Sequence, residues 1–224
     1  MPEYKISVNQ LASFSISSDN KKRSIVKQQK NPPKVLIARY GLAKARIRKA
    51  IANYGNIQPI LDGIQELKNK NPETPLAIVD KAVSIEALER FIKMKLPSFL
   101  QDNIYEILKK PKINSFIVSE VEIIVSADLI IKVFIDGQAF LGGVKIHIAK
   151  GNVFDREQAK YVSTCLYQYL DLMFENTGIV VLPELCLSVD VFAETFFTAP
   201  TEIEKTLEDI ETMCIEIKRI WPNV

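Results

Sequence analysis

The sequence predicts an α/β (α+β) protein with a mixed central β-sheet, flanking helices and a preceding N-terminal helical segment. Three observations indicate this class. Apolar residues recur at helical spacing in the first hundred residues, Val-, Ile- and Phe-rich runs follow from residue 113, and helix and strand patterns then alternate. The 224 residues, 47% of them hydrophobic, can bury a sizeable core. We therefore divide the chain into a basic, helical segment (1–110) and an α/β core (111–224).

The N-terminal segment is expected to be mainly helical. Residues 6–14 form a short strand or helix entry, and the polar stretch 15–33 is expected to be partly loop. Residues 35–54 predict the clearest helix, because apolar side chains follow its period up to Gly55. Further helices are expected at 57–69, at 85–94 with Ser84 as cap and Pro97 beyond its end, and at 98–109.

Strands are expected from residue 113 onward. Segments 116–125, 128–135 and 138–148 predict a β-meander, and Asp136-Gly137 is a hairpin signal between the last two. Asp155 is expected to cap a helix over 156–174. Strands at 185–192 and 194–198 follow, the first of them joining the same sheet, and a helix over 202–220 closes the chain.

Composition excludes several classes of protein. Charged residues interrupt the longest apolar run, 121–135, which is far shorter than a membrane span. The first residues lack the apolar stretch of a signal peptide, so we expect a cytoplasmic protein with no membrane partner. Cys165, Cys186 and Cys214 are odd in number and widely spaced, which favours free thiols and excludes a self-contained four-cysteine metal site.

Charge is distributed along a gradient that the net value of +2 hides. Residues 1–50 hold twelve Lys and Arg against two acids, the middle is balanced, and residues 151–224 hold five against thirteen. The basic positions form two groups: Lys21, Lys22, Arg23, Lys27, Lys30 and Lys34, then Lys44, Arg46, Arg48 and Lys49. Such a surface can bind nucleic-acid phosphates, or it can dock on the acidic third of the chain or on a partner protein.

One carboxylate and one lysine lie on neighbouring predicted strands. Asp128 begins the second strand of the meander and Lys145 lies on the third, with Gly143 two positions before it. An acid and a base on adjacent strands are part of a metal-dependent phosphodiesterase site. Such a site needs further oxygen ligands for its metal, and Gly143 supplies no side chain.

These residues and the order of elements resemble the PD-(D/E)XK nuclease superfamily, most closely its RecB-like, exonuclease-like branch. The resemblance implies a restriction-endonuclease-like fold and a role of a bacterial or phage type in defence or recombination. It implies a metal-binding role for Asp128 and catalytic roles for Asp128, Lys145 and Gln158, the last with Tyr161 beside it on the following helix. Segments 6–14 and 87–91 are similar to upstream parts of that branch.

The chain departs from the family pattern at two ligands. Gly143 replaces the glutamate of the Glu-x-Lys triplet, and Ile85 stands where the upstream histidine belongs. Mg²⁺ prefers several oxygen ligands, so Asp128 alone makes a poor site. The expected cofactor is therefore none, or Mg²⁺ if another acid reaches the site, and the candidates are Glu122, Glu86 and Glu157.

The candidate site residues can instead have purely structural roles. Asp128 can begin a strand or accept backbone hydrogen bonds. Lys145 and His147 can form the exposed face of an antiparallel sheet. Gln158 can be a helix-surface amide, and Gly142-Gly143 a bulge or close-packing device.

Three functions fit the sequence. The first is a catalytically degenerate nuclease-fold protein that binds nucleic acid or a nucleoprotein as an accessory subunit. The second is an active Mg²⁺-dependent nuclease with a migrated ligand. The third is an assembly component that binds a protein partner or a second copy of itself. The nucleic-acid contacts expected for the first are Lys21, Lys22, Arg23, Lys27, Lys30, Lys44 and Arg48.

Overall fold

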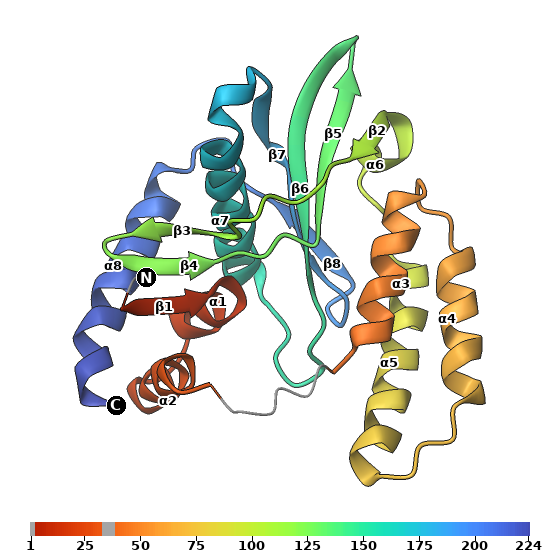
Figure 1. Ribbon diagram of the computed structural model, residues 1–224, viewed down its shortest axis with the longest axis horizontal. Coiled ribbons are helices and arrows are strands. Elements are labelled where there is room, and N and C mark those ends of the chain that lie inside the picture. Colours follow the sequence, from red (N-terminus) through yellow and green to blue (C-terminus); the bar gives the residue numbers. More distant parts are fainter. Residues whose placement is uncertain (1–2, 33–38) are drawn as a thin grey trace.

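A five-stranded mixed sheet lies at the centre of the computed structural model, which describes residues 3–32 and 39–224 (Figure 1). Its strands run in the order β2-β5-β6-β7-β8. Their bounds are β2 Ile104–Ile107, β5 Leu129–Ile135, β6 Gln138–His147, β7 Val180–Asp190 and β8 Thr195–Thr198. The predicted α+β class with a mixed sheet and flanking helices is thus confirmed.

The middle of this sheet follows the sequence prediction. β5 and β6 form an antiparallel hairpin, and both turn residues, Asp136 and Gly137, have positive φ as a tight two-residue turn requires. Helix α7 (Arg156–Phe174) then returns the chain, so that β7 pairs parallel to β6. Asp155 caps this helix in a capping box with Gln158, and the helix has the predicted bounds.

A second, three-stranded sheet corrects the predicted meander. Segment 116–125 forms two short strands, β3 (Ser115–Val118) and β4 (Val121–Ile124), and β4 pairs parallel to β1 (Tyr4–Ser7). The chain reverses at Ser119-Glu120, where both residues have positive φ. Neither residue is glycine, which usually marks such a turn. The sequence therefore gives no sign of the reversal, and the two strands are predicted as one.

Three helical expectations also change. Helix α2 (Asp19–Lys30) occupies most of the expected loop, because Ile25 and Val26 give it a buried face. Helix α5 (Pro75–Lys93) begins ten residues early, with Thr74 as its cap and Ser84 buried in its middle. The expected helix over 98–109 is a short α6 (Ser98–Asp102) followed by β2, which pairs with β5.

The remaining helices lie close to their predicted places. They are α1 (Val8–Ser15), α3 (Gly41–Ala52), α4 (Gln58–Asn69) and α8 (Glu204–Ile220), with short 3₁₀ turns at Glu175–Thr177 and Trp221–Asn223. Residues 35–38 of the predicted 35–54 helix lie outside the described residues. None of the described helices has the length and apolar character needed to cross a membrane.

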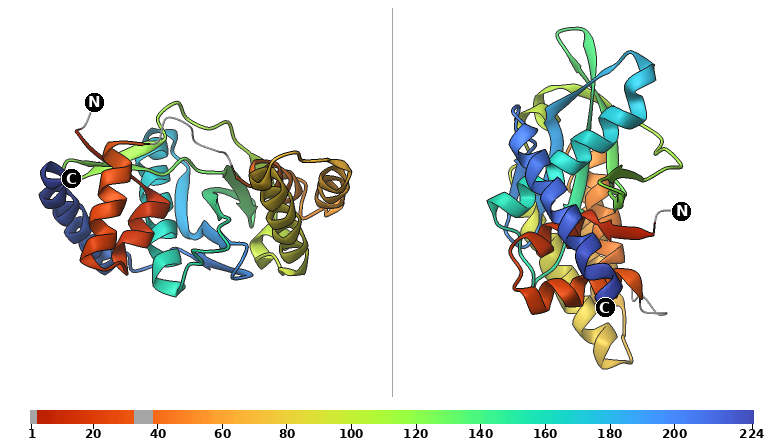
Figure 2. Two further views of the ribbon diagram at one scale, coloured as in Figure 1. Left: turned by 90° about the horizontal axis from the view of Figure 1, so that it is seen from below. Right: turned by 90° about the vertical axis from the view of Figure 1, so that its left-hand side faces the viewer.

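Helices cover the central sheet on both faces (Figure 2). On one face, α3 and α5 pack on alternate side chains such as Ile131 and Val144, and α4 packs on the outer side of these two helices (Figure 1). On the other face, α7 packs on Ile130 and Cys186, and the small sheet with α1, α2 and α8 continues this second core. Strands from before residue 110 pair with strands after it in both sheets. The two predicted segments are thus joined by backbone hydrogen bonds.

Candidate functional site

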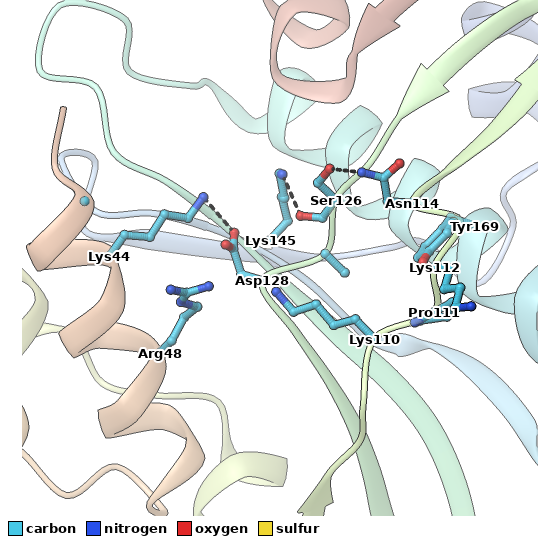
Figure 3. A pocket seen from close by; sticks show the side chains of 12 residues that line it. Lys44, Arg48, Lys110, Pro111, Lys112, Asn114, Ser126, Asp128, Lys145 and Tyr169 are labelled. Atoms are coloured by element: carbon cyan, nitrogen blue, oxygen red, sulfur yellow. Dashed lines mark hydrogen bonds and ion pairs between the residues drawn. The ribbon is translucent and has the colours of Figure 1, made fainter. Parts of the chain in front are cut away.

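Asp128 and Lys145 line the same cavity, of about 520 Å³, at one end of the β5–β6 hairpin (Figure 3). Asp128 directly precedes β5, where its backbone N–H donates to the Val144 carbonyl oxygen. Lys145 lies one residue beyond Val144 on β6. The two side chains therefore face the same side of adjacent strands.

The Asp128 carboxylate is buried and already has two partners. Its Oδ2 accepts a hydrogen bond from the Ile146 backbone N–H at 2.7 Å and lies 3.0 Å from the ammonium of Lys44. Only 5% of the residue is exposed. Accepting a backbone hydrogen bond is one of the structural roles considered from the sequence, and Asp128 performs it here.

Lys145 is also buried, with 8% of its surface exposed. Its ammonium donates to the Ser126 carbonyl oxygen at 3.0 Å. Burial lowers the pKa of Lys145 to about 8; the Asp128 carboxylate opposes this, and the nearby cations of Lys44 and Lys110 add to it. The polar face of β6 is therefore enclosed, contrary to the alternative of an exposed sheet face.

Two opposite walls carry the other basic side chains of the cavity (Figure 3). Helix α3 contributes Lys44 and Arg48, and the segment between β2 and β3 contributes Lys110 and Lys112. Desolvation lowers the pKa of Lys110, and the charges of Arg48 and Lys44 lower it further, whereas Asp128 raises it. Among the cavity-lining residues that the structure describes, five are thus basic and one, Asp128, is acidic.

Lys44 and Arg48 are among the residues predicted from the sequence, whereas Lys110 and Lys112 are not. The run Lys109-Lys110-Pro111-Lys112 is visibly basic in the sequence. The predicted helix over 98–109 ends within this run, at Lys109, whereas in the structure the strand β2 ends just before the run and pairs with β5. Recognising β2 as a strand would have placed this run beside the site.

A side chain at Gly143 would require the packing of α7 to shift. A Cβ atom at this position would lie 2.9 Å from Cδ1 of Leu170 and 3.3 Å from Cδ1 of Leu166, both on α7. The neighbouring Gly142 lies against the backbone of Leu185, at a register shift between β6 and β7. These glycines permit close packing, which is the structural role considered above.

Gln158 lies at the start of α7 and outside the set of residues that line the cavity. Its side-chain oxygen accepts from the Asp155 backbone N–H, and its Nε2 donates to the Ala12 carbonyl oxygen at 3.0 Å. The residue is buried. It therefore caps α7 and holds α1 against it.

The acids considered as additional metal ligands have other partners. Glu86 pairs with Arg90 at 3.1 Å and with Lys150 at 2.7 Å. Glu122 lies on the small sheet and accepts a hydrogen bond from the Ser115 hydroxyl at 2.6 Å. Glu157, in the first turn of α7, pairs with Lys160.

The donor set around Asp128 does not fit the Mg²⁺ ion that the family resemblance implies. Among the cavity-lining residues that the structure describes, Asp128 supplies the one carboxylate, and Lys44 already contacts it. Mg²⁺ takes several oxygen ligands in near-octahedral geometry. Five surrounding cations add electrostatic repulsion to this shortage of ligands.

Part of the basic N-terminal cluster docks on the C-terminal end of the chain. Lys22 pairs with Glu216 of α8 at 2.7 Å, and the ammonium of Lys30 donates to the carbonyl oxygens of Trp221 and Val224, both at 2.9 Å. Lys21, Arg23 and Lys27 are exposed. Lys34 lies outside the described residues. The cluster is thus divided between internal docking and solvent.

A second buried polar group lies further along β6. His147 Nε2 donates to the Asn152 carbonyl oxygen at 2.6 Å, so Nδ1 accepts from the Asn9 amide at 3.3 Å. Burial lowers the pKa of His147, and the Asp190 carboxylate, 3.9 Å away, opposes the change. This arrangement suits a neutral histidine that ties α1 to the loop after β6.

Comparisons of the chain with models of protein families, with curated proteins and with solved structures give no match.

Proposed function

We propose that this protein is a catalytically degenerate, nuclease-like protein that binds nucleic acid through the cavity around Asp128, as an accessory subunit. The observation that carries the proposal is the charge of this cavity, where five basic side chains surround one carboxylate. Phosphate groups are the negatively charged partners that such a cluster recognises in nucleic acids.

The placement of the charges supports binding to phosphate. Arg48 offers a planar fork of N–H donors, and the lysines act as point charges around it. Asp128 neutralises part of the repulsion between the lysines, which keeps them together before a ligand binds. The cationic cavity therefore has a preorganised geometry for an anion.

The same residues argue against an active Mg²⁺-dependent nuclease. The position of the second carboxylate is Gly143, where Leu166 and Leu170 fill the adjacent space. The ammonium of Lys44 lies against the first carboxylate. A binding role requires the cations alone, so it follows from fewer assumptions than catalysis.

The proposal is tested by fluorescence anisotropy with single- and double-stranded oligonucleotides over a salt series. The variant Arg48→Gln/Lys110→Gln removes two cavity cations, one from each wall. We expect its affinity at low salt to fall about tenfold or more. The slope of log affinity against log salt should fall by roughly 1.5–2, because two phosphate contacts are lost.

A matched control changes the net charge by the same amount elsewhere. Lys49, on the same helix as Arg48, and Lys93, at the end of α5, are exposed and do not line the cavity. Lys49→Gln/Lys93→Gln should keep most of the affinity. Equal losses of affinity in the two variants would show that binding depends on net charge and not on the cavity. An absence of binding at low salt would refute the proposal.

A further inference from the structure

The shape of the cavity restricts how a phosphate can enter it. Its floor is the segment 126–128, which connects β4 to β5, with Lys145, and its two walls are α3 and the segment 110–114 (Figure 3). Lys44 and Arg48 on one wall face Lys110 on the other across Asp128. A group held here contacts cations from opposite sides and from below.

Lys145 at the floor is the most enclosed cation of the cavity. Because 8% of the residue is exposed, a phosphate must project into the cavity to reach it. Its ammonium makes one hydrogen bond to the described part of the chain, through Ser126, although an ammonium has three N–H donors. Donors therefore remain for a bound anion.

The wall opposite α3 is fixed before any ligand binds. The Asn114 amide donates to the Ser126 hydroxyl at 2.9 Å, and the Tyr169 hydroxyl donates to the Ile113 carbonyl oxygen at 2.8 Å. The Asn114 carbonyl oxygen accepts from the backbone N–H groups of Val125 and Ser126. Lys110 is thus carried on an anchored segment, which lowers the entropy lost on binding.

We propose that this cavity receives the terminal phosphomonoester of a nucleic-acid strand, so that the protein binds strand ends in preference to internal phosphates. This inference rests on the nucleic-acid binding proposed above. A phosphomonoester carries up to two charges and three free oxygens near neutral pH. An internal phosphodiester carries one charge and two free oxygens, and its chain must enter and leave the site.

The volume agrees with a chain end. Pockets for small molecules measure roughly 300–1,000 Å³, and this cavity of about 520 Å³ lies within that range. It can accept a terminal phosphate with part of its nucleotide. The surrounding basic side chains would then contact the next phosphates along the strand.

The test compares single-stranded oligonucleotides of one sequence, labelled internally, that carry a 5′-phosphate, a 3′-phosphate or hydroxyl groups at both ends. Circular single-stranded DNA, which has no ends, serves as a competitor. We expect at least one phosphorylated oligonucleotide to bind about tenfold more tightly than the hydroxyl-ended one, with the circle competing weakly. The variant Lys145→Met should remove this preference, whereas Lys49→Gln should retain it.

The outcomes separate the two proposals. Equal affinities for phosphorylated and hydroxyl-ended strands, or equally strong competition by the circle, would overturn end recognition and leave general nucleic-acid binding intact. A preference for phosphorylated strands that persists in Lys145→Met and in Arg48→Gln/Lys110→Gln would also overturn it, because the terminal phosphate would then not bind in the cavity. If none of the probes binds at low salt, the proposed function itself fails.

Discussion

Lys145 holds a positive charge where burial opposes it. Burial lowers its pKa from 10.5 to about 8, with the cations of Lys44 and Lys110 adding to the shift and Asp128 opposing it. The charged form therefore costs stability at neutral pH. Such a cost is common at functional sites, where a side chain serves ligand binding at the expense of stability.

Replacing Lys145 with methionine should stabilise the protein at pH 7. The lowered pKa corresponds to a destabilisation of about 3 kcal/mol by the buried charge. Methionine removes this cost but also loses the hydrogen bond to Ser126, which contributes about 1 kcal/mol. We therefore expect the free energy of unfolding to rise by roughly 2 kcal/mol. Urea denaturation of both proteins measures it.

The pH dependence of this gain has a definite sign. Below about pH 8, Lys145 is charged in both the folded and the unfolded protein, and the gain is largest. Between that pH and 10.5, the folded protein releases a proton that the unfolded chain keeps, so stability of the parent protein rises. The advantage of Lys145→Met should therefore shrink on going from pH 7 to pH 10. A destabilised variant at pH 7 would show that the charged lysine supports the fold.

At the scale of elements, β6 combines close packing with the floor of the cavity. Gly142 lies at the register shift where β6 approaches β7, and Gly143 lies beneath α7. Both glycines permit contacts that a side chain would prevent. The strand can therefore lie close to β7 and α7, while its pairing with β5 places Lys145 opposite Asp128.

The two glycines should respond differently to alanine. A methyl group at Gly142 would overlap the backbone of Leu185, whereas one at Gly143 would lie 2.9 Å from the movable end of the Leu170 side chain. We expect Gly143→Ala to lose about 1–3 kcal/mol and Gly142→Ala to lose more, because overpacking against backbone relaxes poorly. Urea denaturation of the two variants gives the comparison, and a larger loss for Gly143→Ala would contradict the packing described for β6.

At the scale of the whole molecule, the two halves of the sequence share their sheets. β1 and β2 come from the first 110 residues and pair with β4 and β5 of the second half. Helices α3 and α5 cover one face of the central sheet, with α4 packed on their outer side. The cavity likewise combines α3 with strands from the second half, so it depends on both halves.

The fragment 111–224 should not unfold cooperatively by itself. It lacks the edge strand β2, the strand β1 and the helices that cover one apolar face of the central sheet. That face would be exposed to water, and the remaining core would be too small to compensate. Circular dichroism during urea titration should show one cooperative transition for the full chain and none for the fragment. A cooperative transition in the fragment would make residues 111–224 an independent domain.

The sequence alone determined the β5–β6 hairpin and helix α7, because their signals are local. Asp136-Gly137 supplies the positive φ angles of a tight turn, and Asp155 with Gln158 forms a capping box, so the β5–β6 hairpin and α7 are encoded within a few residues. The neighbourhood of Asp128 and Lys145 follows from that hairpin. The basic character of the N-terminal segment is equally a property of the sequence.

Only the tertiary structure decided which charges meet. Lys44 and Lys110 are far apart in the chain and face each other because α3 and β2 pack around the same hairpin. Lys22, from the same basic segment, instead meets Glu216. The parallel pairing of β1 with β4 is long-range too, and the turn at Ser119-Glu120 carries no glycine signal. The spacing of residue types along the chain reports local backbone preferences. A cavity depends on packing between distant elements, and the periodicity of the sequence does not encode this packing.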